Sequence, residues 1–114
     1  LSLTRENAAH CGVPDRLITR RRDLLCEVGG SKALDLLCMN PPYIRSDVVD
    51  TLEENVLHEP RLALDGGRDG LVFYRRVLSH LSEYVKEGGH ALFEIGYDQA
   101  DALRALAAEY LKLK

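Results

Sequence analysis

The sequence lacks several features that would assign it to a class at once. No apolar run approaches the roughly 20 residues that cross a membrane, and there are no repeats or low-complexity segments. The 3 cysteines, Cys11, Cys26 and Cys38, form no close pair, which favours a reducing compartment over a disulfide framework or a zinc site. The net charge of −3 argues against a binder of bulk polyanions.

Histidine is also sparse, with 4 residues in the chain. None of them stands at a metal-ligand spacing from cysteine or carboxylate residues, so we expect no metal site. They are His10, His58, His80 and His90.

What is present fits one domain at most, because the chain has 114 residues and an ordinary apolar fraction of 46%. Helical periodicity alternates with short apolar runs, which is typical of an α/β fold with a mainly parallel sheet. A polar segment, 44–58, is expected to be a loop with one helical turn. The expected helices are 2–9, 71–86 and a last one after residue 98, and the expected strands are 17–19, 33–39 and 91–95.

Capping residues set the expected ends of these helices. Ser2 or Thr4 is expected to cap the first helix, and Gly12 to stop it. Gly88-Gly89 is expected to end the second helix, and Asp98 to cap the last. The last helix is expected to bury one face, formed by Leu103, Leu106, Ala107 and Tyr110.

The tetrapeptide Asn40-Pro41-Pro42-Tyr43, an NPPY motif, follows the most apolar strand, at the sheet edge where α/β proteins place ligands. Proline restricts its own φ and the residue before it, so the chain cannot continue as a helix. The Asn40 amide oxygen and the Pro41 carbonyl are therefore expected to face one place as free acceptors, with the Tyr43 ring beside them. Two acceptors and a flat ring suit a planar NH2 group, whose nitrogen is a poor nucleophile until it is held toward an electrophile.

The alternative is that Pro-Pro only ends a strand and that Tyr43 only packs. Other residues have structural interpretations as well. The spacing of Gly66, Gly67 and Gly70 is not that of a phosphate loop, so turns are expected there. Glu94, within an expected buried strand, is interpreted as a hydrogen-bonded structural residue or as support for the site. The run 20–22 is interpreted as a solvated strand end rather than a contact for RNA or an acidic patch.

Residues 40–44 resemble the signature of amino methyltransferases that use S-adenosylmethionine. The stretch 58–71, continuing to Arg76, narrows the resemblance to the HemK (PrmC) family, the glutamine methyltransferases of peptide-chain release factors. Residues 1–9, Asp23 and Phe93–Gly96 with Gln99 also match. The resemblance therefore covers nearly the whole chain.

The resemblance implies that Asn40, Pro41, Pro42 and Tyr43 bind the target glutamine amide, with Asn40, Pro41 and Tyr43 acting in catalysis and Asn40 also near the methyl donor. It implies that Asp23 and Leu24 contact the adenine of S-adenosylmethionine. Leu24 stands where many members have an aromatic residue, so apolar contact rather than ring stacking is expected.

For fold, the resemblance implies that residues 1–114 are part of a Rossmann-like class I methyltransferase domain. The family's first two strands, its glycine-rich loop, its N-terminal docking domain and its C-terminal hairpin have no match in this sequence. We expect the third strand, 17–19, to lose its neighbours, so that only the fourth and fifth strands pair. We also expect the 114 residues alone to bind S-adenosylmethionine weakly or not at all.

Two other functions stay open: an adenine amino methyltransferase acting on DNA or RNA, and an inactive segment that only binds a partner or packs in an assembly. A release factor is the expected protein partner, and no membrane is expected. Nucleic acid is not required, although the ribosome can be near. A second copy is one way to cover exposed sheet edges. The expected location is the bacterial cytosol, or the mitochondrion in a eukaryote.

Overall fold

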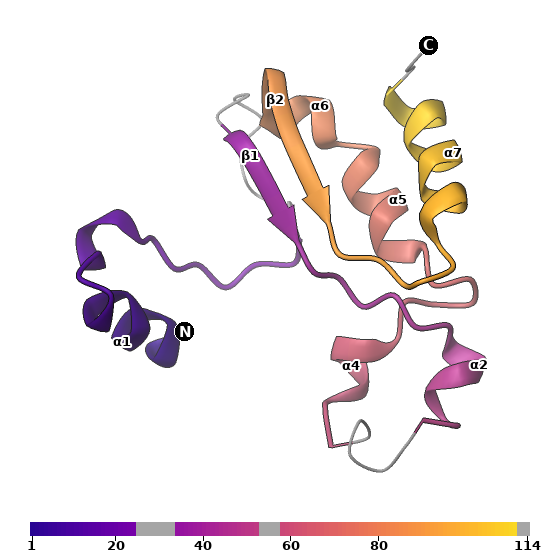
Figure 1. Ribbon diagram of the computed structural model, residues 1–114, viewed down its shortest axis with the longest axis horizontal. Helices are drawn as coiled ribbons and strands as arrows, with labels where there is room; N and C mark the ends of the chain where they lie inside the picture. Colours follow the sequence, from indigo (N-terminus) through magenta and orange to yellow (C-terminus); the bar gives the residue numbers. More distant parts are fainter. Residues whose placement is uncertain (25–33, 53–57, 112–114) are drawn as a thin grey trace.

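The computed structural model describes residues 1–24, 34–52 and 58–111. Its core is a two-stranded parallel sheet packed against helices, with a separate helix near the N-terminus (Figure 1). The elements are α1 (Ser2–His10), the 3-10 helix η1 (Pro14–Arg16), β1 (Leu34–Met39), α2 (Ser46–Val49), α4 (Arg61–Leu64), α5 (Val72–Leu78), α6 (Leu81–Tyr84), β2 (Val85–Phe93) and α7 (Ala100–Leu111). The prediction of a mixed α/β chain with parallel strands is confirmed. Within the described ranges, no helix is long and apolar enough to cross a bilayer.

The sheet pairs β1 with β2 in register from Leu36 opposite His90 to Met39 opposite Phe93. Side chains of parallel strands alternate between the two faces. Leu37 and Met39 turn toward the helices, whereas Leu36 and Leu92 are 50% and 59% exposed. The expectation of a fully buried strand is therefore wrong for one face, because the described helices pack on the other.

The core lies between that covered face and helices α5, α6 and α7. Tyr74 is fully buried, its ring lies edge-on to Phe93 at a centroid distance of 5.8 Å, and its hydroxyl donates to the Glu94 carbonyl at 2.7 Å. Burial raises the pKa of Tyr74 to about 12. The buried cluster places one face of the segment 71–81 in the core; it consists of Leu71, Tyr74, Val77, Leu78, Leu81 and Leu106.

The single helix predicted over 71–86 is wrong in its extent. The chain forms α5, breaks near His80, forms the short α6 and enters β2 at Val85. Gly88-Gly89 therefore lies inside a strand and does not end a helix. Pairing with β1 overrides the local periodicity, since a strand gains its hydrogen bonds from a neighbour that the local sequence does not reveal.

The first helix is confirmed, but its predicted cap is wrong. Leu1 occupies the N-cap position and no side chain caps the helix, because Ser2 and Thr4 lie within α1. Gly12 stops the helix as expected, with φ of 70° and its N–H donating to the Ala9 carbonyl at 3.0 Å. In Figure 1, α1 lies apart from the sheet.

Residues 17–19 do not form the predicted strand, and among the described residues only β1 and β2 pair. This confirms that the segment lacks strand neighbours while the next two strands keep theirs. The Thr19 hydroxyl instead accepts a hydrogen bond from Arg5 Nε at 2.7 Å. The following run, 20–22, is consequently not a strand end; Arg20 and Arg21 are exposed.

The last helix, α7, is confirmed, with Leu106 buried and Leu103 and Ala107 half-buried on its inner face. Tyr110 is 39% exposed and does not belong to that face. Asp98 was predicted to cap this helix. The side chain that bonds the turn before the helix is instead that of Gln99, which accepts a hydrogen bond from the Gly96 N–H at 2.9 Å.

Candidate functional site

The NPPY motif lies immediately beyond the carboxyl end of β1. The last inter-strand contact is the Glu94 N–H donating to the Met39 carbonyl at 2.9 Å, and Asn40 comes next. Asn40 is exposed and Pro41 is buried. Among the described residues, no hydrogen bond reaches the Asn40 side chain or the Pro41 carbonyl. Both acceptors thus lack a hydrogen bond from the described residues, and their role in binding an amide stays a prediction.

The backbone after the motif is held by the segment around Gly66. Ile44 and Asp65 form a parallel bridge, in which the Ile44 N–H donates to the Leu64 carbonyl at 3.0 Å and the Gly66 N–H donates to the Ile44 carbonyl at 2.8 Å. A Cβ at Gly66 would stand 2.7 Å from Tyr43 Cα, closer than real Cβ contacts come. Gly66 therefore lets two backbones touch.

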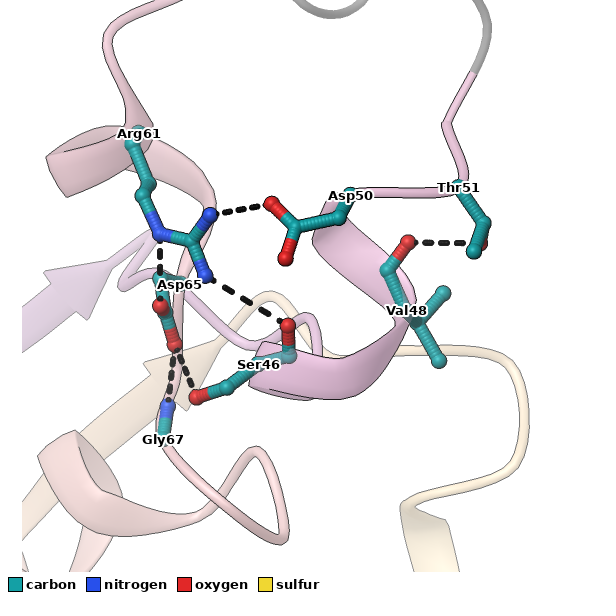
Figure 2. A network of polar contacts seen from close by, with 7 residues as sticks. All are labelled: Ser46, Val48, Asp50, Thr51, Arg61, Asp65 and Gly67. Carbon is teal, nitrogen blue, oxygen red and sulfur yellow. Dashed lines mark hydrogen bonds and ion pairs between the residues drawn. The ribbon is translucent and has the colours of Figure 1, made fainter.

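Asp65 is the centre of the polar network in Figure 2. Its carboxylate accepts from the Ser46 hydroxyl at 2.6 Å, the Gly67 N–H at 2.9 Å and Arg61 Nε at 3.2 Å. Arg61 also pairs with Asp50, so α4 and α2 are joined. The hydrogen bond from Ser46 is the main cause that lowers the pKa of Asp65. This network fixes the loop that follows the motif.

Tyr43 is the motif's link to β2. Its hydroxyl donates to Glu94 Oε1 at 3.1 Å, and partial burial, followed by that contact, raises the pKa of Tyr43. Glu94 lies one residue past β2 with its side chain exposed, so the prediction that it sits in a buried strand is wrong. The hydrogen bond from Tyr43 shows that Glu94 is a hydrogen-bonded residue, and a role in supporting the site stays a prediction.

Gln99 joins the motif to a second glycine. Its side-chain amide donates to the Tyr43 carbonyl at 3.0 Å and to the Gly70 carbonyl at 3.3 Å. Gly67 and Gly70 have φ of 89° and 73°, which confirms that they are turn residues.

A hollow of about 480 Å³ lies beside Tyr43, at the same end of the sheet as the motif. Its lining mixes apolar side chains with charged ones. It includes Tyr43, Val48, Leu71, Arg45, Asp69 and Tyr97.

Asp69 forms an ion pair with Arg75 and accepts the Leu71 N–H at 3.1 Å. Arg75 is the main cause that lowers the pKa of Asp69 from 3.8 to about 2. The pair stabilises the entry into α5.

The pairing of Asp69 predicts a specific acid sensitivity. Because the folded-state pKa is below the ordinary value, the pair stabilises the fold above about pH 4 and loses this contribution as pH falls toward 2. Both side chains are over one-third exposed, so we expect only about 0.5 kcal/mol. An NMR titration of the Asp69 carboxyl in the native chain and in Arg75→Met measures it. If the two titrations coincide, Arg75 is not the cause.

The residues predicted to contact a cofactor lie near α5. Asp23 Oδ2 accepts from Arg76 at 2.8 Å, and its side chain is 70% exposed. Leu24 is half-buried against the core cluster and has φ of 54°. The Asp23 side chain is thus largely exposed although it pairs with Arg76, and Leu24 packs against the core. Among the described residues, no hydrogen bond joins Asp23 or Leu24 to the motif.

Sequence reasoning did not predict a role for Asp65, Ser46 or Arg61. No spacing rule signals that such residues converge, since the serine and the aspartate are 19 positions apart. Within the described ranges, no group of three histidine, cysteine or carboxylate residues could hold a metal ion. Cys26 lies outside the described residues.

No protein-family model matches the chain. The chain is similar, however, to the release factor glutamine methyltransferase of Caulobacter vibrioides, with 47% identity over 107 residues. It is also similar to proteins of that name from Clostridium botulinum, with 41% identity over 109 residues, and from Streptococcus pneumoniae, with 35% over 115.

These alignments cover 93%, 94% and 100% of this chain, but 37%, 38% and 40% of the three relatives. The resemblance to release factor glutamine methyltransferases that residues 40–44 and 58–76 indicated is therefore confirmed along the whole chain. The chain spans about two-fifths of the length of these relatives.

Proposed function

We propose that this chain is the amide-binding part of an enzyme that methylates the side-chain nitrogen of a glutamine in a peptide-chain release factor. The observation that carries the proposal is the pair of unbonded acceptors, the Asn40 side chain and the Pro41 carbonyl, beside the half-buried Tyr43 ring at the end of β1. The names of the relatives support the choice of substrate.

The chemistry follows from what a carboxamide needs. The lone pair of the amide nitrogen is delocalised. The protein would therefore accelerate methyl transfer by orienting the amide and by fixed dipoles rather than by a strong base. Asn40 Oδ1 and the Pro41 carbonyl accept the two N–H groups, and Tyr43, oriented by Glu94, packs on the amide. Transfer would replace one N–H bond with a bond to the methyl carbon while the bond between that carbon and the donor's sulfur breaks; the sulfur would leave as a neutral thioether and the proton would pass to water.

We propose S-adenosylmethionine as the methyl donor; when bound, it supplies an electrophilic methyl group on a sulfonium, whose charge an aromatic face tolerates. The Asp23 carboxylate would accept a hydrogen bond from the adenine amine, Leu24 would make an apolar contact with the ring, and Asn40 would lie near the methyl group. The sheet of the described residues has only β1 and β2, so the proposal extends to a larger Rossmann-like class I domain that completes the site.

If a larger domain completes the site, the affinity of this chain alone for S-adenosylmethionine should be low. We expect isothermal calorimetry of S-adenosylmethionine with the 114-residue chain alone to show no binding, or a dissociation constant weaker than about 1 mM (about −4 kcal/mol). Micromolar binding by the chain alone would contradict the proposal that other protein supplies most of the donor site.

The exposed side chains of Leu36 and Leu92 also indicate that this chain is part of a larger domain. Parallel sheets are normally covered on both faces, and these side chains lie on the face that the described helices leave open. We propose that the rest of the protein covers this face, and that a second copy is the alternative cover. A cytoplasmic location, or a mitochondrial one in a eukaryote, accompanies the proposed substrate.

The experiment compares acceptors for a labelled methyl group, using the full-length protein that carries this chain. We expect label on a release factor, no label on the same factor with its target glutamine replaced by glutamate, and none on adenine-containing oligonucleotides. Label on the oligonucleotide instead would favour the adenine amino methyltransferase. Label on neither would favour an inactive binding segment.

A further inference from the structure

Gln99 is the one polar side chain that is buried among the described residues, with 8% of its surface exposed. It stands just before α7 and reaches three backbone groups. Its Oε1 accepts from the Gly96 N–H at 2.9 Å, and its Nε2 donates to the Tyr43 carbonyl at 3.0 Å and the Gly70 carbonyl at 3.3 Å.

These partners determine which way the amide points. Two carbonyl oxygens need the NH2 end, and one N–H needs the oxygen end, so a flipped amide would lose all three bonds. Both Nε2 protons and one Oε1 lone pair are thereby used. A buried amide with its hydrogen bonds satisfied holds its neighbours in one arrangement, because any other arrangement leaves buried polar groups unpaired.

The three partners belong to three different loops at the same end of the sheet. Tyr43 closes the NPPY motif after β1, Gly70 ends the glycine turn before α5, and Gly96 follows β2. The fit is close: a Cβ at Gly70 would stand 2.4 Å from the Tyr43 carbonyl oxygen and 2.5 Å from Gln99 Nε2. Gln99 is thus the point where the loops meet.

We propose that Gln99 is a positioning residue that holds the Tyr43 carbonyl, and through it the whole NPPY motif, in the conformation that presents the free acceptors to the substrate amide. This inference rests on the proposed function. The motif has no hydrogen bonds from described residues to the Asn40 side chain or the Pro41 carbonyl, so its path depends on the anchoring at its Tyr43 end. Gln99 acts there without touching the reacting atoms.

The test uses the full-length protein carrying this chain and two variants of similar size. Gln99→Met removes all three hydrogen bonds. Gln99→Glu keeps an acceptor for the Gly96 N–H but sets an oxygen against two carbonyl oxygens. For both we expect kcat for release-factor methylation to fall 10- to 100-fold, because small displacements of positioning groups have effects of that size. The dissociation constant for S-adenosylmethionine should change less than threefold.

A second readout does not depend on activity. Amide hydrogen exchange of residues 40–46 should become at least tenfold faster in both variants, since the segment loses its anchor. Val77→Ala is the matched control. Val77 is 1% exposed in the core and takes no part in the three hydrogen bonds of the Gln99 side chain. This variant should lower Tm about as much as the Gln99 variants do. Its kcat, normalised to the concentration of sites that bind the methyl donor, and its amide exchange at residues 40–46 should stay within twofold of the unmodified protein.

Unchanged kcat per donor-binding site in both Gln99 variants would overturn the inference, and so would equal effects of Val77→Ala. If the unmodified protein transfers no methyl group to a release factor, the proposed function fails. The exchange of residues 40–46 still decides in that case whether Gln99 anchors the motif, so the two failures are distinguishable.

Discussion

Replacing Asn40 with alanine is expected to abolish methyl transfer, lowering kcat at least about 100-fold in the full-length protein, the size seen when one preorganised hydrogen-bonding group is lost. The substitution removes one of two acceptors for the substrate amide. Folding should change little, because the Asn40 side chain is exposed and makes no hydrogen bond with the described residues. Steady-state methylation of a release factor, together with a thermal melt, measures both effects.

Two further variants sharpen the Asn40 result. Asn40→Asp keeps an oxygen acceptor, so we expect a smaller loss of kcat than in Asn40→Ala. Asp47→Ala, in the nearby helix α2, removes an exposed partner of Arg45 at 2.5 Å and should leave kcat within twofold. A near-normal rate in Asn40→Ala would show that the residue does not orient the amide.

Gly70→Ala is expected to destabilise the fold by about 2–5 kcal/mol, combining about 1–2 kcal/mol for a side chain at positive φ with about 1–3 kcal/mol for overpacking. Gly70 has φ of 73°, and an added Cβ would meet the Tyr43 carbonyl oxygen and the Gln99 amide. We also expect reduced kcat, since the contact moves the NPPY motif. Chemical denaturation with the methylation assay tests both.

Gly88→Ala provides the matched control for this prediction. Gly88 has a similar φ of 79°, but nothing lies within 4 Å of an added Cβ. Its expected loss is therefore the conformational part alone, about 1–2 kcal/mol, with kcat unchanged. Equal losses of stability and rate in the two variants would show that contact with Tyr43 and Gln99 is unimportant.

Much of the local structure follows from residue order. The apolar run before Asn40 predicts β1, Gly12 predicts the end of α1, and the period of Leu103 and Leu106 predicts α7. The secondary-structure predictions were wrong where the structure depends on a partner distant in sequence. Val85–Gly89 is a strand because β1 lies beside it, and 17–19 is not a strand because no described strand pairs with it. Hydrogen bonds between strands join residues about 50 positions apart, which no local pattern contains.

The same division holds for the site. Two prolines after an apolar strand are enough to leave Asn40 and Pro41 as free acceptors, since proline geometry is local. The support of that motif is not local: Glu94 reaches Tyr43 across 51 positions and Gln99 reaches it across 56. Residue identity alone did not distinguish these two polar residues from other polar residues near a sheet.

By itself, the sequence determined the chemistry this protein presents, because the side chains of the NPPY motif and the stiffness of its prolines are properties of neighbouring residues. Its composition also excluded a membrane-spanning segment and favoured one small α/β unit. Only the tertiary structure decided how the motif is held, with Gly66 behind it, Asp65 fixing the loop after it and Gln99 bonded to its last carbonyl. The physical reason is that close backbone contact and buried hydrogen bonds exist only when segments remote in sequence are packed together.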